Sequence, residues 1–157
     1  MQKVVILTVG RLKEKACDAL CAEYIKRIGA FARVEVRELP EAPLPADPSP
    51  AQIAMALARE ARDFRRAIPA GAYTVALCVE GQGMDSPAFA AALEQARSPV
   101  LCFLIGGSHG LEEELKREAA LRLSFSALTF PHQLFRVMLL EQIYRAYMIQ
   151  QGRAYHK

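Results

Sequence analysis

The sequence lacks the cysteine and histidine spacings that hold structural zinc. Its four cysteines form no Cys-x-x-Cys pair, and its three histidines lie far apart along the chain. We therefore expect no metal site. The thiols are instead expected to be free and buried, because unpaired cysteine behaves as a small apolar residue; they are Cys17, Cys21, Cys78 and Cys102.

Long apolar runs are also missing. No run reaches the roughly 18 residues that a membrane span needs. The longest, near the C-terminus, is interrupted by Arg136, Glu141 and Arg145. The apolar stretch 4–7 is too short for a secretion signal and has no small-residue cleavage site after it. We therefore expect no membrane association, and a cytoplasmic location.

The chain has 157 residues, of which 52% are hydrophobic, which predicts a single domain over residues 1–157. Its charge is unevenly distributed. Residues 121–157 contain five basic side chains and one acidic side chain, a balance of +4 within a formal total of +3. A basic C-terminal region on a nearly neutral body indicates an anionic partner such as a nucleic acid.

Apolar strand-like segments alternate with amphipathic helical segments along the whole chain. Five of the nine prolines fall in 40–50, which predicts an exposed loop there. The alternation predicts a parallel α/β sheet, in which ligands bind beyond the carboxyl ends of the strands. We expect strands at 4–9, 34–39, 73–79, 100–105 and 121–125, and helices at 13–28, 51–67, 86–97, from 111, and at 132–150.

A glycine-rich turn, 106–110, follows the fourth predicted strand. Its Gly-Gly-x-x-Gly spacing is not the Gly-x-Gly-x-x-Gly of dinucleotide sites, and it lacks the Gly-Lys-Ser/Thr of a P-loop. Three glutamates at 112–114 would repel phosphate. The turn therefore favours an uncharged or cationic small molecule, and the alternative is a tight turn without function.

The last predicted helix begins at His132, which shares a helix face with Arg136. His132 is either a site residue or a capping and packing group. The helix is apolar on nearly every face, so it is either central in the fold or covered by a second copy of the chain; we predict a homodimer. The tail, 152–157, could stack a base and bind phosphate, or fray.

Taken together, these segments closely resemble the small SPOUT-class methyltransferases that modify pseudouridine in bacterial 23S ribosomal RNA. The resemblance extends over the whole chain and is sharpest in its last 55 residues. It is carried by four motifs in the family's order: Phe103-Leu104-Ile105-Gly106-Gly107-x-x-Gly110-Leu111, Ser124-Phe125-Ser126-x-Leu128-Thr129-Phe130-Pro131-His132-Gln133-Leu134-x-Arg136-Val137, Leu140-Glu141-Gln142-x-Tyr144-Arg145-Ala146 and Tyr155-His156-Lys157.

The resemblance implies a Rossmann-like SPOUT fold, homodimeric, with a C-terminal trefoil knot, a rare exception among folds. It implies that the knot binds S-adenosyl-L-methionine without a metal. The implied cofactor contacts lie at or just beyond the carboxyl ends of the predicted strands 73–79, 100–105 and 121–125, where strand order also places a ligand. They are Leu77, Gly106, Gly107, Phe125, Ser126, Ala127, Leu128, Thr129 and Phe130.

The implied reaction is methylation of N3 of a pseudouridine in helix 69 of 23S rRNA, on the assembled 70S ribosome. The N3 proton must leave, so a base or a charge-stabilising group would help. The candidates are His132, Arg136, Tyr155 and His156, the last two reaching the partner subunit's cofactor. Family members often carry an acid where this chain has His109, so no role of that acid is transferred.

Two other functions are compatible with the sequence. A SPOUT methyltransferase acting on tRNA is the nearest, although the chain has no RNA-binding extension. A non-catalytic, ribosome-associated RNA-binding dimer is the second, although the intact glycine turn and the complete tail argue against it.

Overall fold

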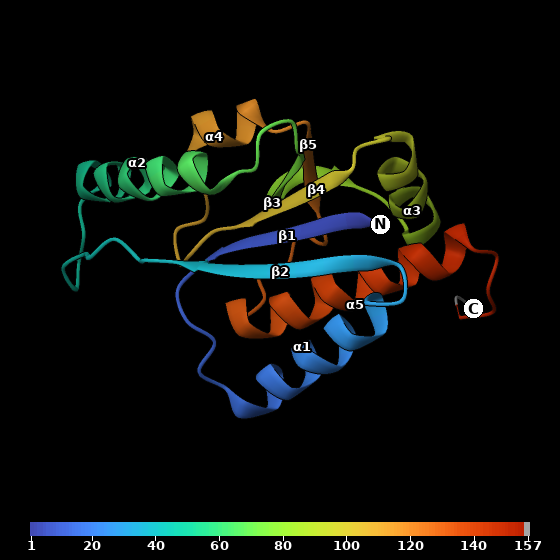
Figure 1. Ribbon diagram of the computed structural model, residues 1–157. Helices are drawn as coiled ribbons and strands as arrows, with labels where there is room; N and C mark the ends of the chain where they lie inside the picture. The colour runs from blue at the N-terminus through green and yellow to red at the C-terminus, as the bar shows by residue number, and fades with distance from the viewer. Residues whose placement is uncertain (156–157) are drawn as a thin grey trace.

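The computed structural model describes residues 1–155 and contains one five-stranded sheet (Figure 1). Every pair of neighbouring strands is parallel, which confirms the predicted sheet. The strand order is β2-β1-β4-β3-β5, so β4 is the central strand, with β1 and β3 beside it. The strands are β1 (Gln2–Val9), β2 (Ala32–Leu39), β3 (Tyr73–Gly83), β4 (Val100–Ile105) and β5 (Leu121–Ser124).

Helices cover both faces of the sheet, as crossover connections between parallel strands require (Figure 1). The two faces use alternate residues of each strand: in β1, Val4 and Ile6 pack on one side, and Val5 and Leu7 on the other. The first face carries α1 (Lys15–Ile28), α3 (Ser86–Gln95) and α5 (His132–Gln150), and the second carries α2 (Pro50–Ala67) and α4 (Glu113–Glu118).

Local sequence signals explain where two helices begin. Ser49 and Gln52 form a capping box at the start of α2, with Pro50 in the first turn. The cap of α3 is Asp85, whose side chain accepts a hydrogen bond from the Ala88 amide, and Ser86, where the helix is predicted to begin, is its first residue. Asp85 also has the extended backbone that a capping residue adopts.

The proline-rich loop before α2 is mostly exposed, as predicted, except at one point. Ala42 is buried, and its N–H donates to a carboxylate oxygen of the buried Glu60 at 2.9 Å. Burial raises the pKa of Glu60, although the Ala42 hydrogen bond opposes this shift. Glu60 therefore anchors the loop to the side of α2.

Strand β3 is longer than the sequence indicates. The sequence predicts an apolar strand only to Val79, followed by a loop that begins with Glu80-Gly81-Gln82-Gly83. In the structure β3 continues to Gly83, and an irregularity after Leu77 lets Gln82 pair with Leu123 of β5. Residues 78–81 lie between the two paired parts of β3 and do not pair in regular register with β5. Glycine is tolerated at such an irregularity, so Gly81 does not end the strand.

The cysteines are free, as predicted, but only Cys21 and Cys102 are buried; Cys17 and Cys78 are half-buried. Within residues 1–155 there is no cluster of side chains that could hold a metal ion. Over the same residues no helix is both long and apolar enough to cross a membrane. The trefoil knot stays a prediction.

Gly81 provides a test of the extended β3. A Cβ atom at this position would lie 2.8 Å from the backbone carbons of Arg122 and Leu123, whereas one at Gly83 would meet nothing within 4 Å. We expect Gly81→Ala to lower the free energy of unfolding by about 1–3 kcal/mol, and Gly83→Ala to change it little. Urea denaturation measures both, and equal effects would contradict the close pairing at Gly81.

Candidate functional site

The carboxyl ends of β3, β4 and β5 meet around the glycine turn, as parallel pairing requires. They form a pocket of about 390 Å³, a size typical of small-molecule sites. We call it the glycine-turn pocket. Its lining residues are Leu77, Cys78, Val79, Glu80, Ile105, Gly106, Gly107, Ser108, His109, Gly110, Leu111, Lys116, Leu123, Phe125, Ser126, Leu128, Thr129, Phe130, His132 and Phe135.

The glycine turn can close only with glycine at two positions. The Gly110 N–H donates to the Gly107 carbonyl at 3.0 Å, and Gly110 has a φ of 76°, in the left-handed region. A Cβ atom on Gly106 would lie 2.3 Å from the Gly110 carbonyl oxygen. The turn therefore brings bare backbone to the pocket wall.

One wall of the pocket is apolar and its rim is charged. Phe125 and Phe135 pack with ring centroids 4.9 Å apart, and Leu77 and Leu123 are buried beside them. At the rim, Lys116 forms ion pairs with Glu80 and Glu113. The pocket thus combines a flat apolar surface with a small number of polar groups, which suits a ligand that has both parts.

The same ion pairs shift the pKa values of two rim residues, Lys116 and Glu80. Burial alone would lower the pKa of Lys116, but its bonds to Glu80 and Glu113 outweigh burial and raise it. The hydrogen bond from Lys116 lowers the pKa of Glu80. Both groups are therefore charged at neutral pH.

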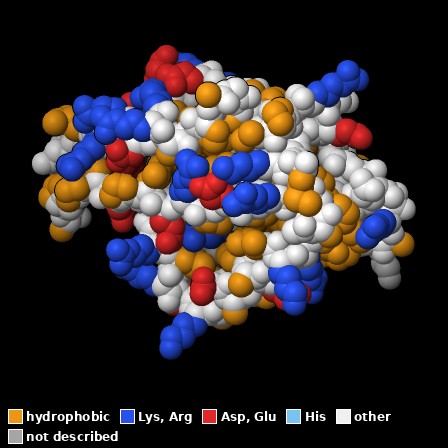
Figure 2. Space-filling view, viewed as in Figure 1, with side chains coloured by type: hydrophobic (Ala, Val, Ile, Leu, Met, Phe, Trp, Pro, Cys, Tyr) orange, Lys and Arg blue, Asp and Glu red, His pale blue; other side chains and the backbone are white. Residues whose placement is uncertain are grey.

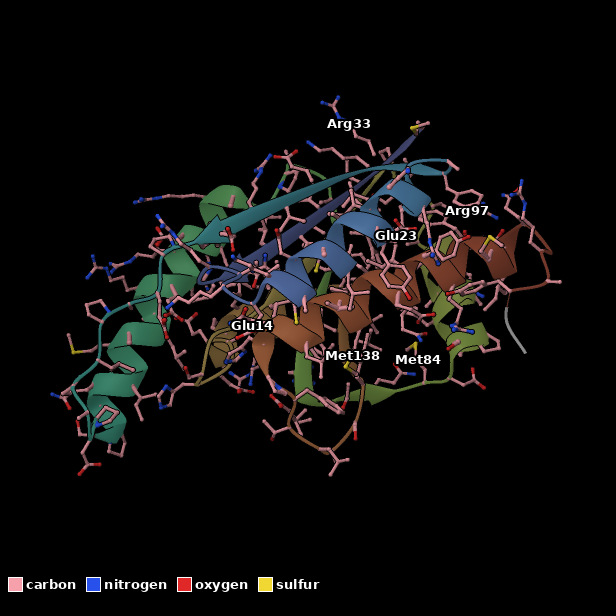
Figure 3. All side chains as sticks on the ribbon, turned by 90° about the horizontal axis from the view of Figure 1, so that it is seen from below. Glu14, Glu23, Arg33, Met84, Arg97 and Met138 are labelled. Carbon is pink, nitrogen blue, oxygen red and sulfur yellow. The ribbon has the colours of Figure 1, made fainter. Side chains whose placement is uncertain are left out.

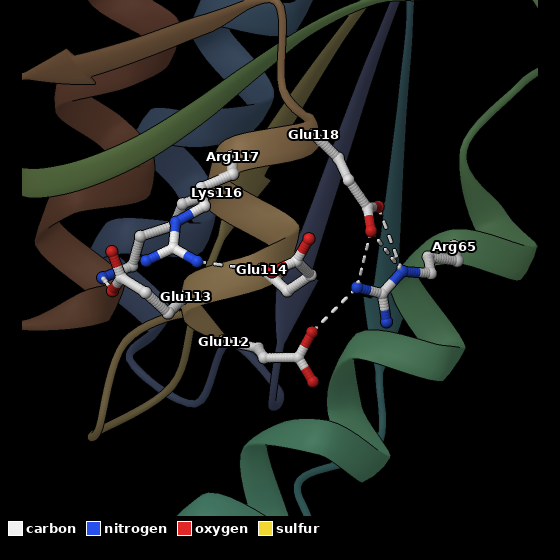
Figure 4. Close-up of polar contacts among 7 residues, drawn as sticks. All are labelled: Arg65, Glu112, Glu113, Glu114, Lys116, Arg117 and Glu118. Carbon is white, nitrogen blue, oxygen red and sulfur yellow. Dashed lines mark hydrogen bonds and ion pairs between the residues drawn. The ribbon is translucent and has the colours of Figure 1, made fainter.

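The glutamates that follow the glycine turn are not free negative charges. Arg65 of α2 binds Glu112 at 2.8 Å and Glu118 at 2.9 Å, and Arg117 lies 3.5 Å from Glu114 (Figure 4). These contacts tie α4 to α2 behind the pocket. The expected repulsion of phosphate by residues 112–114 is therefore weaker than the sequence indicates.

A second pocket, of about 530 Å³, opens at the carboxyl ends of β1 and β2. We call it the β1–β2 pocket. It shares Gly107, Ser108 and His132 with the glycine-turn pocket. Its remaining lining residues are Val9, Gly10, Arg11, Lys13, Glu38, Leu39, Pro40 and Glu41. Two pockets with a common wall can hold two reactants side by side.

Arg136 lines neither pocket. It is 7% exposed, and its Nη2 donates to Glu38 Oε2 at 3.1 Å. The same carboxylate oxygen accepts the Leu12 N–H at 2.7 Å, while Gln133 Oε1 accepts the amides of Lys13 and Glu14. The start of α5 therefore holds the 10–14 loop, which forms one wall of the β1–β2 pocket. The Nε of Arg136 is buried without a hydrogen-bond partner among the described residues.

Most of the predicted cofactor residues line the glycine-turn pocket. Among them only Ala127 does not, although it belongs to the same loop. His132 borders both pockets. The residues that sequence reasoning missed include Cys78, Val79, Glu80, Lys116 and Phe135. Cys78 and Val79 end the predicted strand 73–79, and Glu80 begins the segment predicted as a loop, which belongs to β3 in the structure.

Tyr155 follows the end of α5 and packs back against residues 141–145 of that helix. Its hydroxyl donates to Glu141 Oε1 at 3.2 Å, its ring packs edge-on against Tyr144, and Arg145 stacks over it. Burial, with the nearby Glu141 charge, raises the pKa of Tyr155 to about 12. Glu141 is nine residues beyond His132, roughly 13 Å along the helix. His156, which is predicted to act together with Tyr155, lies outside the described residues.

An apolar groove runs along the outer side of α5. Figure 3 shows Met84, which follows β3, near Met138 of α5, with α1 alongside. The groove has a volume of about 660 Å³ and is lined by apolar side chains that include Tyr24, Phe125 and Val137, with Glu141 and Gln142 at one end.

Comparison with known proteins identifies one family. The model described as "Predicted SPOUT methyltransferase" matches residues 2–156. The chain is 45% identical over 160 residues to "Ribosomal RNA large subunit methyltransferase H" of Moorella thermoacetica, covering all of both chains. It is 42% identical to the protein of that name from Leuconostoc citreum, over 97% of this chain and 98% of the relative.

A solved structure has the same fold. It is titled a probable methylase family protein from Haemophilus influenzae, with a TM-score of 0.58 and 10% sequence identity. The match covers 99% of this chain and 70% of that one. At this identity, the likeness concerns the fold alone.

The contact between Arg136 and Glu38 can be tested by a double-mutant cycle. Arg136→Met keeps the buried stem but removes the charge. We expect it to lower the free energy of unfolding by about 1–3 kcal/mol, less than for a fully buried pair because the Glu38 side chain is 38% exposed.

Glu38→Gln keeps an acceptor for the Leu12 amide, so the double variant should lose less than the sum of the two single changes. The exposed pair Arg117 and Glu114, changed to Met and Gln, is the matched control and should show almost no coupling. Additive losses at Arg136 and Glu38 would contradict the proposed support of the 10–14 loop.

Proposed function

The chain belongs to the SPOUT methyltransferase family, and on that basis we propose that it transfers a methyl group from S-adenosyl-L-methionine to N3 of a pseudouridine in helix 69 of 23S rRNA. The substrate is the assembled 70S ribosome, and the protein acts as a homodimer in the cytoplasm. The relatives that it matches over nearly their whole length are named as methyltransferases of large-subunit ribosomal RNA.

The observation that carries this proposal is the wall shared by the two pockets. Gly107, Ser108 and His132 border both. A methyl donor in one pocket and a nucleotide in the other would meet across this wall. Holding two reactants in contact removes much of the entropic barrier to their reaction, and a methyl transfer from sulfonium needs little else.

The residues of the glycine-turn pocket fit the cofactor. The aromatic and aliphatic wall, with Phe125, Phe135 and Leu77, suits a flat adenine ring. The tight turn at Gly106 brings backbone groups within reach of the polar parts. Glu80 and Lys116 supply both charges at the rim. When bound, the cofactor supplies an electrophilic methyl group and its own leaving group.

His132 is the side chain best placed to handle the N3 proton. It stands on the shared wall at the start of α5, where an imidazole nitrogen can accept a hydrogen bond from the nucleotide. Arg136, one turn later, acts as a positioning residue through Glu38. Tyr155 is too far along α5 to serve its own pocket, so we assign it, with His156, to the partner subunit's site.

The homodimer would cover the groove along α5. Met84, Met138 and Phe125 are only half-buried there, which leaves an apolar surface on a helix that the sequence makes apolar on nearly every side. Covering it with a second copy would also bring the tail of one subunit toward the other. A trefoil knot at the C-terminal end is part of the same proposal.

Label transfer from radioactive S-adenosyl-L-methionine tests the function. We expect label on 70S ribosomes that lack the modification, and little on protein-free 23S rRNA or on tRNA. Mapping should locate it in helix 69. Label on tRNA would show that tRNA, and not the ribosome, is the substrate. Cofactor binding without any label would favour the non-catalytic RNA-binding dimer.

The same assay tests His132. His132→Gln should bind the cofactor with unchanged affinity but turn over roughly 100-fold more slowly. The substitution removes a proton acceptor but keeps the pocket wall intact. His109→Gln, on the glycine turn, is the matched control and should keep its rate. Wild-type turnover in His132→Gln would exclude His132 as the base.

The dimer can be tested with two methionines. Met138→Lys should dissociate the dimer, because a charge in the apolar groove cannot be buried against a second copy. Met55→Lys on α2, where the side chain is 74% exposed, should leave it intact. Sedimentation velocity measures both, and a Met138→Lys dimer of wild-type stability would place the interface elsewhere.

A further inference from the structure

Three arginines on α2 form a basic face that the catalytic proposal does not use. Arg59, Arg62 and Arg66 are exposed and lie three and four residues apart, so they share one side of the helix. Among residues 1–155 none of the three has an ion-pair partner, whereas Arg65 is bound to Glu112 and Glu118. Figure 2 shows blue side chains gathered at the end of the molecule where α2 lies.

The three arginines line a groove of about 390 Å³, which we call the α2 groove. Its other lining residues include two carboxylates, Asp63 and Glu41, so the guanidinium groups are in excess by one. Arginine binds phosphate through two parallel hydrogen bonds, which suits it to an anionic chain even when carboxylates are nearby.

The α2 groove is continuous with the site. Pro40 and Glu41 line both this groove and the β1–β2 pocket. The adjoining Ala42 is anchored by its hydrogen bond to the buried Glu60, which fixes the ridge between the two hollows. The three hollows therefore form one path, from the glycine-turn pocket across His132 to the β1–β2 pocket and on to α2.

We propose that Arg59, Arg62 and Arg66 bind successive phosphates of the RNA strand whose target nucleotide enters the β1–β2 pocket. This inference rests on the proposed function. Arg59 and Arg66 are seven residues apart, roughly 10 Å along the helix, which corresponds to about three stacked nucleotides of one strand. Phosphate contacts of this kind set the register of the strand without reading its sequence.

The test replaces all three arginines with glutamine. The control removes three positive charges elsewhere, at Lys26, Arg33 and Arg117, and a third protein carries lysine at the three α2 positions. Binding to 70S ribosomes by co-sedimentation is measured between 50 and 300 mM salt. Methylation kinetics, cofactor affinity and circular dichroism are measured alongside.

We expect the glutamine variant to bind ribosomes roughly 10- to 50-fold more weakly near 150 mM salt, with a smaller salt dependence, because three counterion-releasing contacts are lost. Its KM should rise by a similar factor while kcat and cofactor affinity stay within about twofold. The lysine variant should recover most of the binding, and the control should resemble wild type.

Equal weakening of the glutamine variant and the control would overturn the inference, because it would show an effect of net charge alone. Unchanged binding in the glutamine variant would overturn it as well. Selective loss of ribosome binding in a protein whose wild type transfers no methyl group would support the α2 surface and reject the proposed function.

Discussion

The site depends on one carboxylate. Glu38 stands at the end of β2, and a single oxygen of it accepts both the Leu12 amide and the Arg136 guanidinium. It therefore joins the 10–14 loop after β1 to the start of α5, segments about 120 residues apart. Because α5 begins at His132, this junction also determines where His132 stands between the two pockets. Without it, the parallel sheet would still place the strand ends together, but the two pockets would lack a fixed common wall.

Such a junction is costly to build for stability alone. Arg136 is almost fully buried, and its Nε has no partner among the described residues, while Glu38 remains partly exposed. Replacing both members of a buried ion pair by well-packed apolar side chains is often neutral or stabilising, whereas removing one member alone is destabilising. A partly exposed pair can nevertheless specify geometry, since the charges favour one arrangement of loop and helix over nearby alternatives. On the proposed function we therefore assign Arg136 a positioning role, although its place in the Pro-His-Gln-Leu-x-Arg motif makes it a catalytic candidate.

The sequence is sufficient to predict the elements and the edge at which ligands bind, because periodicity and strand order are local properties. The alternation of Val4 to Leu7 between two cores, for example, follows from the buried parallel strand that their apolar run indicates. What it could not predict are arrangements made by distant partners. Gly81 and Gly83 indicate a loop in the sequence, and only the pairing with β5 makes them part of a strand. The four arginines of α2 are likewise indistinguishable in the sequence, and only the fold places Glu112 and Glu118 beside Arg65. The three that lack these partners are Arg59, Arg62 and Arg66. The place of Tyr155 likewise depends on Glu141, Tyr144 and Arg145 of the preceding helix.

The charges are divided in a way that suits the two reactants. Around the glycine-turn pocket, four carboxylates surround two cations, so acidic groups are in excess: Glu80 and Glu113 bind Lys116, and Glu112 and Glu118 bind Arg65. A cationic sulfonium cofactor meets no excess of like charge there. Along the path toward α2, the basic side chains of Arg11, Lys13, Arg59, Arg62 and Arg66 have no ion-pair partners within residues 1–155. Pairing of Arg65 holds α2 against α4, and the other three arginines belong to the same helix. The ion pairs beside the cofactor pocket therefore also hold the helix whose unpaired arginines a polyanion would contact.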